Sequence, residues 1–327
     1  MSMETSPTWS CVQHLMEATA TKVWQPRSMP NDEEGERVDA DLPFIVDAHV
    51  HLFPDPVFRA IWRWFEKHAW PIRYQLPTPD VIRFLLSRGV GHIVALHYAH
   101  VPGMARGMNR YMAEICRSEP RVTGLATVLP GEDGAEEILE EAFSLGLAGV
   151  KLHCHVQCFS PDDDAMHAIY SMCEKYDRPL VMHAGREPKS DAHKCDPYLL
   201  CAAERVDRAL RDHPRLRLCI PHLGADEFEA YEKLLEEHDH LWLDTTMMLA
   251  DYFPIQLPPR ILTTRPERIL YGTDFPILPY AWDRELRRAR TLKLRDNQLE
   301  LLLGDNARAL FGIGSGSPPI TPGSLSP

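Results

Sequence analysis

Eight short apolar segments recur along the chain between residues 44 and 276. Each has the length of a buried β-strand and is too short for a typical helix, and branched and aromatic residues are frequent in them. The segments are 44–53, 92–99, 121–130, 149–156, 179–185, 217–224, 241–248 and 268–276. The pattern therefore predicts eight strands.

Most of these segments are followed by a stretch in which apolar residues recur at helical spacing, for example 164–176, 201–213 and 225–238. Buried strands that alternate with amphipathic helices predict parallel pairing through right-handed crossovers, and eight such units close into a (β/α)8 TIM barrel. An open doubly wound sheet is the alternative, but no Gly-x-Gly-x-x-Gly motif follows any segment, so a dinucleotide-binding fold has little support. We expect one α/β barrel domain over residues 43–313.

The two ends of the chain depart from this alternation. Residues 1–42 mix Ser, Thr and Pro with an acidic run, which predicts an N-terminal arm. Residues 314–327 are rich in Gly, Ser and Pro and predict a disordered tail, because they bury too little surface to offset the entropy of ordering. Segment 53–78 is far longer than a usual loop between a strand and its helix, so we expect an insertion that covers the barrel mouth as a lid.

Composition narrows the possible functions. The 327 residues are 44% hydrophobic, which supports a buried core. The 47 acidic and 35 basic residues give a formal charge of −12, which disfavours nucleic acid and anionic membrane surfaces as partners. The eight cysteines are scattered, the N-terminus lacks a secretory pattern, and no segment approaches the roughly 20 apolar residues of a membrane span. We expect a cytoplasmic protein that acts on a small-molecule substrate.

The apolar segments turn polar at their carboxyl ends, where barrel enzymes place their active sites. The first segment ends in Asp-Ala-His-Val-His, and the alternation of a strand puts His49 and His51 on one face. The fifth and sixth segments end with His183 and His222, and the eighth ends with Asp274. If these side chains converge, their imidazoles and carboxylate suit Zn²⁺ or a similar divalent ion, with a position left open for water.

These motifs resemble those of the amidohydrolase superfamily, in particular the amidohydrolase-related family that includes aminocarboxymuconate semialdehyde decarboxylase. The resemblance rests on DAHVHLF, GVKLH, LVMHAG, PHLG, LWLDTT, YGTDFP and GDNARALFG, which together span residues 47–312. It implies that His49, His51, His183 and Asp274 hold one divalent metal ion, zinc in the first place, with manganese or iron as alternatives. It also implies that His222 acts on the bound water or on the substrate.

The chemistry required of these residues agrees with the resemblance. A bound divalent ion lowers the pKa of its water toward about 7. Asp274, as a catalytic residue, can accept the proton of that water and deliver it to a leaving group, while His222 polarises a substrate oxygen or orients the water. Asp47 and Asp244 are expected to orient histidines through the second ring nitrogen. The resemblance further implies a structural hydrogen bond from Asn306 and a possible homodimer.

Lys151 leaves a second arrangement open. In two-metal amidohydrolases a lysine on the fourth strand is carboxylated and bridges two ions. In the family that this chain resembles, the lysine of GVKLH serves as a cation near the site, so we expect a single ion. An additional zinc-like cluster of His153, Cys154, His155 and Cys158 is conceivable, but ordinary packing is the simpler interpretation.

The lid segment is rich in tryptophan and arginine. Trp62, Arg59, Arg63 and Arg73 are candidates for substrate binding, because the planar guanidinium group matches the geometry of a carboxylate. The alternative is an exposed or dimer-facing helix.

The expected function is metal-dependent hydrolysis, in which a metal-bound water cleaves an ester, lactone or amide bond in a small, anionic organic molecule. The alternative is a non-oxidative decarboxylase, a carbon–carbon lyase with the same metal site. Some lyases of the resembling family carry Glu in place of the first histidine, so His49 mildly favours hydrolysis, although the semialdehyde decarboxylase also keeps both histidines. A catalytically inactive binding barrel conflicts with the complete set of ligand residues.

Overall fold

The structure is a computed structural model that describes residues 26–27, 29, 32–186, 192 and 194–314. The first 25 residues of the expected arm and nearly all of the expected tail lie outside these described residues. Among the described residues, no helix combines the length and the apolar character needed to cross a bilayer.

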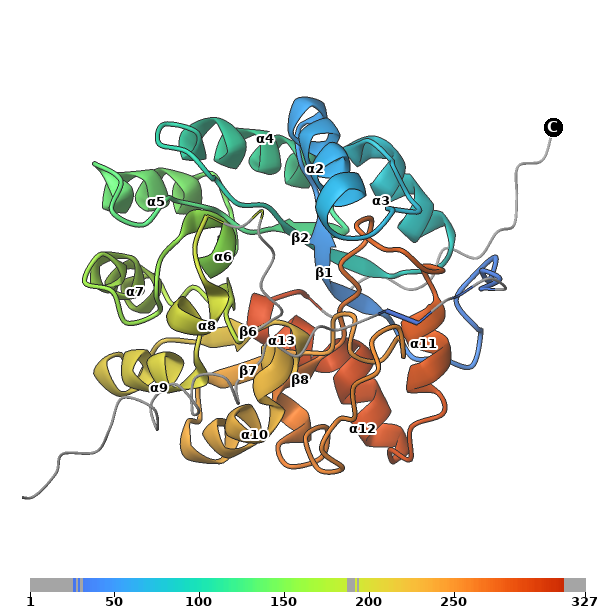
Figure 1. The fold of residues 1–327 in the computed structure, drawn as a ribbon. Helices are drawn as coiled ribbons and strands as arrows, with labels where there is room; N and C mark the ends of the chain where they lie inside the picture. Colours follow the sequence, from blue (N-terminus) through green and yellow to red (C-terminus); the bar gives the residue numbers. More distant parts are fainter. Residues whose placement is uncertain (1–25, 28, 30–31, 187–191, 193, 315–327) are drawn as a thin grey trace, which may run out of the picture.

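The described residues contain eight parallel strands that form a closed barrel (Figure 1). One sheet has the order β1-β2-β3 and the other the order β4-β5-β6-β7-β8. Parallel bridges from Ala126 to Val150 and from Val50 to Phe275 join the two sheets. The strands are β1 Val46–His51, β2 His92–Leu96, β3 Val122–Gly124, β4 Val150–His153, β5 Leu180–His183, β6 Leu218–Ile220, β7 Leu241–Asp244 and β8 Ile269–Leu270. Each lies in one of the eight apolar segments, and the predicted (β/α)8 fold is confirmed.

Helices surround the strands on the outside of the barrel (Figure 1). The α-helices are α2 Asp55–His68, α3 Thr78–Ser87, α4 Ala105–Ser118, α5 Ala135–Ser144, α6 Cys154–Gln157, α7 Met166–Lys175, α8 Pro197–Leu200, α9 Ala203–Asp212, α10 Phe228–Glu237, α11 Arg284–Ala289, α12 Asp296–Glu300 and α13 Asn306–Phe311. Two 3-10 turns, η1 His222–Glu227 and η2 Pro266–Arg268, and a π turn, η3 Leu301–Asp305, complete the described elements.

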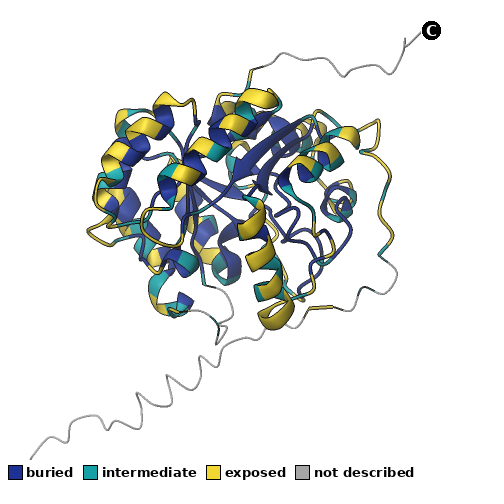
Figure 2. Cartoon of the chain, turned by 90° about the horizontal axis from the view of Figure 1, so that it is seen from above, coloured by how far each residue is buried: buried dark blue, intermediate teal, exposed yellow. Residues whose placement is uncertain are grey.

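The helices lie on the strands through one apolar face each, as their sequence spacing predicts. In α10 the buried side chains are Phe228, Tyr231, Leu234 and Leu235, which recur at intervals of three and four residues. The strands are buried along their length, and exposure is concentrated on the outer faces of the helices (Figure 2). The carboxyl ends of the strands are therefore held by a continuous core.

The last helix, α13, packs against the strands. Leu310 and Phe311 of α13 share an apolar cluster with strand residues such as Val181 and Leu270. The side-chain amide of Asn306 donates to the carbonyl oxygens of Pro266 and Ile269, each at 2.7 Å. This confirms the structural hydrogen bond expected of Asn306 and ties the helix to the start of β8.

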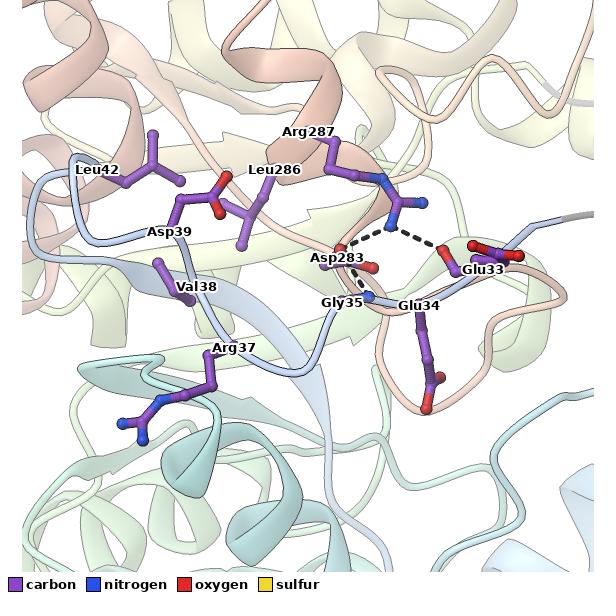
Figure 3. Close-up of a pocket in the computed structure, with 10 residues that line it drawn as sticks. All are labelled: Glu33, Glu34, Gly35, Arg37, Val38, Asp39, Leu42, Asp283, Leu286 and Arg287. Atoms are coloured by element: carbon purple, nitrogen blue, oxygen red, sulfur yellow. Dashed lines mark hydrogen bonds and ion pairs between the residues drawn. The ribbon is translucent and has the colours of Figure 1, made fainter.

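Residues 32–42 of the arm run along α11, where Arg287 reaches Asp283 and the carbonyl oxygen of Glu33 (Figure 3). Asp32 is the main anchor of this contact. Its carboxylate is 4% exposed, lies 2.9 Å from the guanidinium group of Arg284 and 3.3 Å from that of Arg287, and accepts a hydrogen bond from the backbone of Ala281. The arm is thus fastened to α11 and to the turn before it by the buried carboxylate of Asp32.

We predict that Asp32→Asn lowers the free energy of unfolding by about 2 kcal/mol, because two arginines lose their shared, buried carboxylate. Urea unfolding checks this value. Asp39→Asn is the matched control, since the Asp39 carboxylate is 50% exposed in its pair with Arg290 and its loss should cost less than about 1 kcal/mol. Equal effects of the two changes would contradict the anchoring role of Asp32.

Candidate metal centre

His49 and His51 of β1 and Asp274 after β8 form a buried group in which one potential ligand atom from each lies within 4.8 Å of the others. Oδ1 of Asp274 lies 3.3 Å from Nε2 of His49 and 3.0 Å from Nε2 of His51. Strand alternation predicts the shared face of the two histidines, and the closure of β8 onto β1 brings the carboxylate to them. Three of the four expected ligands therefore lie together.

His49 is oriented by Asp244 at the end of β7, as the sequence predicts. Nδ1 of His49 lies 2.8 Å from Oδ2 of Asp244. Burial alone would raise the pKa of Asp244, but the nearby His49 and the hydrogen bond from it hold that pKa well below its usual range. Because the ionised carboxylate only accepts, Nδ1 carries the proton and Nε2 keeps its lone pair.

The donor set fits a divalent cation. Nε2 of His49 is buried and makes no hydrogen bond to any described residue, and it faces Oδ1 of Asp274. Burial lowers the pKa of His49 to about 4, so its imidazole is neutral at pH 7. Burial opposes ionisation of Asp274, but the hydrogen bond and charge of His51 keep the pKa of this carboxyl well below its usual range. Two electron-pair donors that face each other in a buried space require a cation between them.

Asp47 has a different role from the one expected. Its carboxylate accepts hydrogen bonds from the backbone N–H of His49 and Thr273 and, at 2.6 Å, from the hydroxyl of Thr273, so it contacts no imidazole ring. Burial raises the pKa of Asp47 to about 7, partly offset by these hydrogen bonds. Asp47 positions the turn that carries Asp274 rather than a histidine ring.

Both predicted catalytic residues have left-handed backbones. Asp274 has φ 76° and His222 has φ 56°, conformations that cost side-chain-bearing residues about 1–3 kcal/mol and cluster at functional sites. Gly272 permits the close approach of the Asp274 turn to β1, because a Cβ there would lie 2.7 Å from the Cβ of His49. The left-handed backbone at both turns directs the side chains of Asp274 and His222 toward the cavity.

His222 faces the same space from the end of β6. Its backbone N–H donates to Oδ1 of Asp244 at 3.1 Å, and its Nδ1 lies 3.0 Å from the carbonyl oxygen of Thr246. Since a carbonyl only accepts, Nδ1 donates the proton and Nε2 is left as a base. The rings of His222 and His49 have centroids 5.7 Å apart.

His183, the fourth expected ligand, ends β5 beside His222, with ring centroids 4.5 Å apart. Its potential ligand atom belongs to a second group, formed with the half-buried His153 and the buried His155. The structure thus shows two neighbouring sets of donors, with His183 in the set that lacks Asp274.

Lys151 is fully buried in β4, and its Nζ makes no hydrogen bond to any described residue. Burial lowers the pKa of Lys151 to about 8, against the attraction of Asp244 and Asp274. The lysine therefore lies close enough to both carboxylates to act as the site cation that the sequence suggests.

A cavity of about 640 Å³ opens onto these residues. One part is lined by Asp274, Tyr98 and the histidines His51, His153, His155, His183 and His222, and the other part is mostly apolar but includes Lys194. The apolar lining comes from α2 and from loops after the strands, and it includes Val57, Ile61, Trp64, Phe65, Trp70, Met247, Met248, Phe253 and Ile277.

The predicted substrate-binding residues of the lid segment lie elsewhere. Trp62 stacks on Phe58 with ring centroids 5.7 Å apart, and it does not line the cavity. Arg59 and Arg63 are exposed and are also absent from the lining, while Arg73 binds the carbonyl oxygen of Asp32 in the arm.

Trp64, which lines the cavity from α2 together with Val57, Ile61 and Phe65, was not among the substrate-binding residues predicted from the sequence. Its spacing from Val57 and Ile61 marks an apolar helical stripe, so the 3.6-residue period was the signal that could have found it.

Solved structures similar to this chain share its barrel. An uncharacterised TIM-barrel protein from Bordetella bronchiseptica is 19% identical, with TM-score 0.61, and the match covers 83% of this chain and 99% of that one. A 5-carboxyvanillate decarboxylase from Novosphingobium aromaticivorans, complexed with manganese and 4-hydroxy-3-methoxy-5-nitrobenzoic acid, is 16% identical, with TM-score 0.60 and coverage of 88% and 100%. A 2,6-dihydroxybenzoate decarboxylase from Rhizobium is 17% identical, with TM-score 0.58 and coverage of 83% and 99%. These likenesses show the fold.

No curated protein matches the sequence closely enough to count as a relative. The amidohydrolase family matches it over residues 46–313, which includes every strand and every residue of the candidate centre. This chain belongs to the amidohydrolase family and is a metal-dependent enzyme of the amidohydrolase superfamily.

Proposed function

We propose that this enzyme is a metal-dependent, non-oxidative decarboxylase of small aromatic or enolic acids. The observation that carries the proposal is the two-sided cavity. Its histidine-rich end suits a metal-bound acid group, and its aromatic wall suits a flat, apolar body. Two similar solved structures are named decarboxylases of carboxylated phenols, which agrees with such a substrate.

In this proposal His49, His51 and Asp274 hold one divalent ion. Three protein ligands with an open position are usual for a catalytic metal site. Zinc suits the two imidazoles, and manganese is present in the similar 5-carboxyvanillate decarboxylase. The bound ion supplies Lewis-acid polarisation of substrate oxygens.

The chain's own residues supply the proton chemistry. Loss of CO₂ leaves an electron pair on carbon, which must then take up a proton. Asp274 and His222 both line the cavity, and Nε2 of His222 has its lone pair available because Nδ1 is bound to Thr246. Asp274 or His222 thus takes up the proton of the substrate's acid or hydroxyl group and returns it to the carbon as CO₂ leaves, while the apolar wall of α2 excludes water from the carbon.

Hydrolysis of an ester, lactone or amide is the second candidate function. The match to the amidohydrolase family and the retention of both histidines of the first strand favour it. A screen of aromatic acids, lactones, esters and amides that records CO₂ and proton release separately tests both functions. Release of CO₂ from an aromatic acid supports decarboxylation, and turnover of neutral esters or lactones alone would overturn it.

We predict that Asp274→Asn removes one bound ion per chain and lowers the rate by about 10²-fold or more, because the shell loses its negative ligand. Elemental analysis and CO₂ release measure the two effects. Asp39→Asn, an exposed change far from the cavity, should alter neither. Full metal content and turnover in Asp274→Asn would refute the site assignment.

For His222→Asn we predict a fall in kcat of roughly 10²-fold with the ion retained, which is the usual scale for a group that transfers or orients a proton. The same two measurements separate this role from that of a ligand. Loss of the ion together with activity would make His222 part of the metal shell.

For Trp64→Ala we predict a rise in KM of about 10-fold for an aromatic acid with metal content unchanged, because the substrate loses an aromatic wall. Arg59→Ala, on the exposed side of the same helix, is the matched control and should leave KM within about two-fold. If Arg59→Ala raised KM by about 10-fold and Trp64→Ala left it unchanged, the result would favour the arginine-based lid predicted from the sequence.

A further inference from the structure

Three histidines form a second, largely buried cluster at the barrel mouth, which we call the three-histidine cluster: His153, His155 and His183. One potential ligand atom from each lies within 4.8 Å of the other two. His153 and His183 end neighbouring strands and are paired in register, and His155 lies in α6, directly after β4. The ring centroids are 4.0 Å apart for His153 and His183, 4.9 Å for His155 and His183, and 5.3 Å for His153 and His155.

We propose that the three-histidine cluster is a second metal site, separate from the site of His49, His51 and Asp274, and that it takes a borderline-soft divalent ion such as Zn²⁺ or Co²⁺. Three imidazoles without a carboxylate are the donors that such ions prefer, whereas Mg²⁺ and Ca²⁺ prefer oxygen. All three histidines line the cavity, from which an ion and water can reach them.

An unsatisfied polar atom supports this proposal. Nδ1 of His153 is buried and makes no hydrogen bond to any described residue. Buried polar side-chain atoms nearly always have a partner, so an exception needs an explanation such as an ion. A metal ion held by His153 and the two neighbouring imidazoles would give Nδ1 of His153 its partner.

The backbone around the cluster is fixed in a way that a ligand site requires. The side chain of Gln157 accepts from the N–H of His153 at 2.8 Å and donates to the carbonyl oxygens of Ala99 and Val128 at 2.8 and 2.9 Å. It therefore clamps the turn that carries His155 to the loops after β2 and β3.

Binding requires one ring to turn. The rings of His153 and His183 are stacked at 8°, and a metal ion must lie near the plane of each ligating ring. The χ2 torsion of histidine has a broad energy profile, so rotation of one imidazole in place opens the stack at low cost.

This assignment differs from the two-metal arrangement that a carboxylated Lys151 would create. Lys151 lies in the same strand two residues before His153, but its partners in charge are Asp244 and Asp274 of the first site. His183 could serve either arrangement, so it does not discriminate between them. His153 and His155 belong to the three-histidine cluster alone, and Lys151 belongs only to the bridged arrangement.

The test is cobalt binding by the full-length protein after removal of metal with a chelator. Equilibrium dialysis against Co²⁺ and elemental analysis count the ions, and visible absorption reports their coordination. We expect about two ions per chain in the wild type and about one in His155→Gln and in His153→Gln, with the absorption of the remaining ion unchanged in both variants. His240→Gln is the matched control, because His240 is exposed and does not line the cavity, and it should retain both ions.

Two results would overturn the proposal. One is a wild type that binds a single ion, lost in Asp274→Asn and retained in His155→Gln. The other is a second ion that is lost in Lys151→Met but kept in both cluster variants, which would place it at a carboxylated lysine. Circular dichroism of each variant separates loss of an ion from loss of the fold. Because CO₂ release by the first site is measured independently, failure of the second site leaves the proposed decarboxylase function standing.

Discussion

The carboxylate of Asp244 accepts hydrogen bonds from three directions at the end of β7. Oδ2 receives Nδ1 of His49 at 2.8 Å, and Oδ1 receives the backbone N–H groups of His222 and Thr246, each at 3.1 Å. One buried anion thus fixes the tautomer of a β1 histidine and the backbone of the histidine after β6. Burial of a lone carboxylate is costly, and these charge-assisted bonds offset the cost only while all three donors stay in place. The relative position of β1, β6 and β7 at the mouth follows from this one group.

A second buried carboxylate, that of Asp47, likewise fixes the backbone where the chain after β8 meets β1. Asp47 binds the hydroxyl and N–H of Thr273, and the hydroxyl of Thr273 in turn accepts from the N–H of Phe275. The residue between them is Asp274, which is held at φ 76°. The same hydrogen bonds therefore close the barrel and place a ligand. They join the end of the last strand to β1, and they hold Asp274 in the strained conformation in which it faces His49 and His51.

The barrel could be predicted from the sequence because its signal is local and repeated. Each of the eight apolar segments contains a strand, and His49 and His51 share a site because strand geometry has a period of two residues. Which side chains from different strands lie together at the site could not be predicted in this way. Whether His183 lies nearer to Asp274 or to His153 depends on the register of β4 with β5, which no single segment encodes.

Charged residues of the lid segment were harder still to place from sequence. Arginines beside tryptophans indicated a cationic lid, but Arg73 instead meets Asp32, a residue 41 positions away in a different segment. The partner of a long, flexible side chain is decided by tertiary structure, and a helix turns its apolar stripe to the cavity whether or not charges lie beside it. Hence the helical period gave a better guide to the cavity wall than residue chemistry did.

The charges at the site bear on how the acid substrate proposed above would be attracted without those arginines. Asp244 and Asp274 are ionised because their pKa values lie well below the usual range, and Lys151, with its pKa of about 8, is mostly protonated at pH 7. These three groups together carry a net negative charge and oppose the entry of a carboxylate, whereas Lys194, which also lines the cavity, attracts one. A bound divalent ion reverses the sign of the local charge in a water-poor cavity, where electrostatic interactions are strong. In the proposed decarboxylase a bound ion would thus help to admit an acid to the site as well as activate it, and the aromatic wall of α2 would contribute shape and apolar contact.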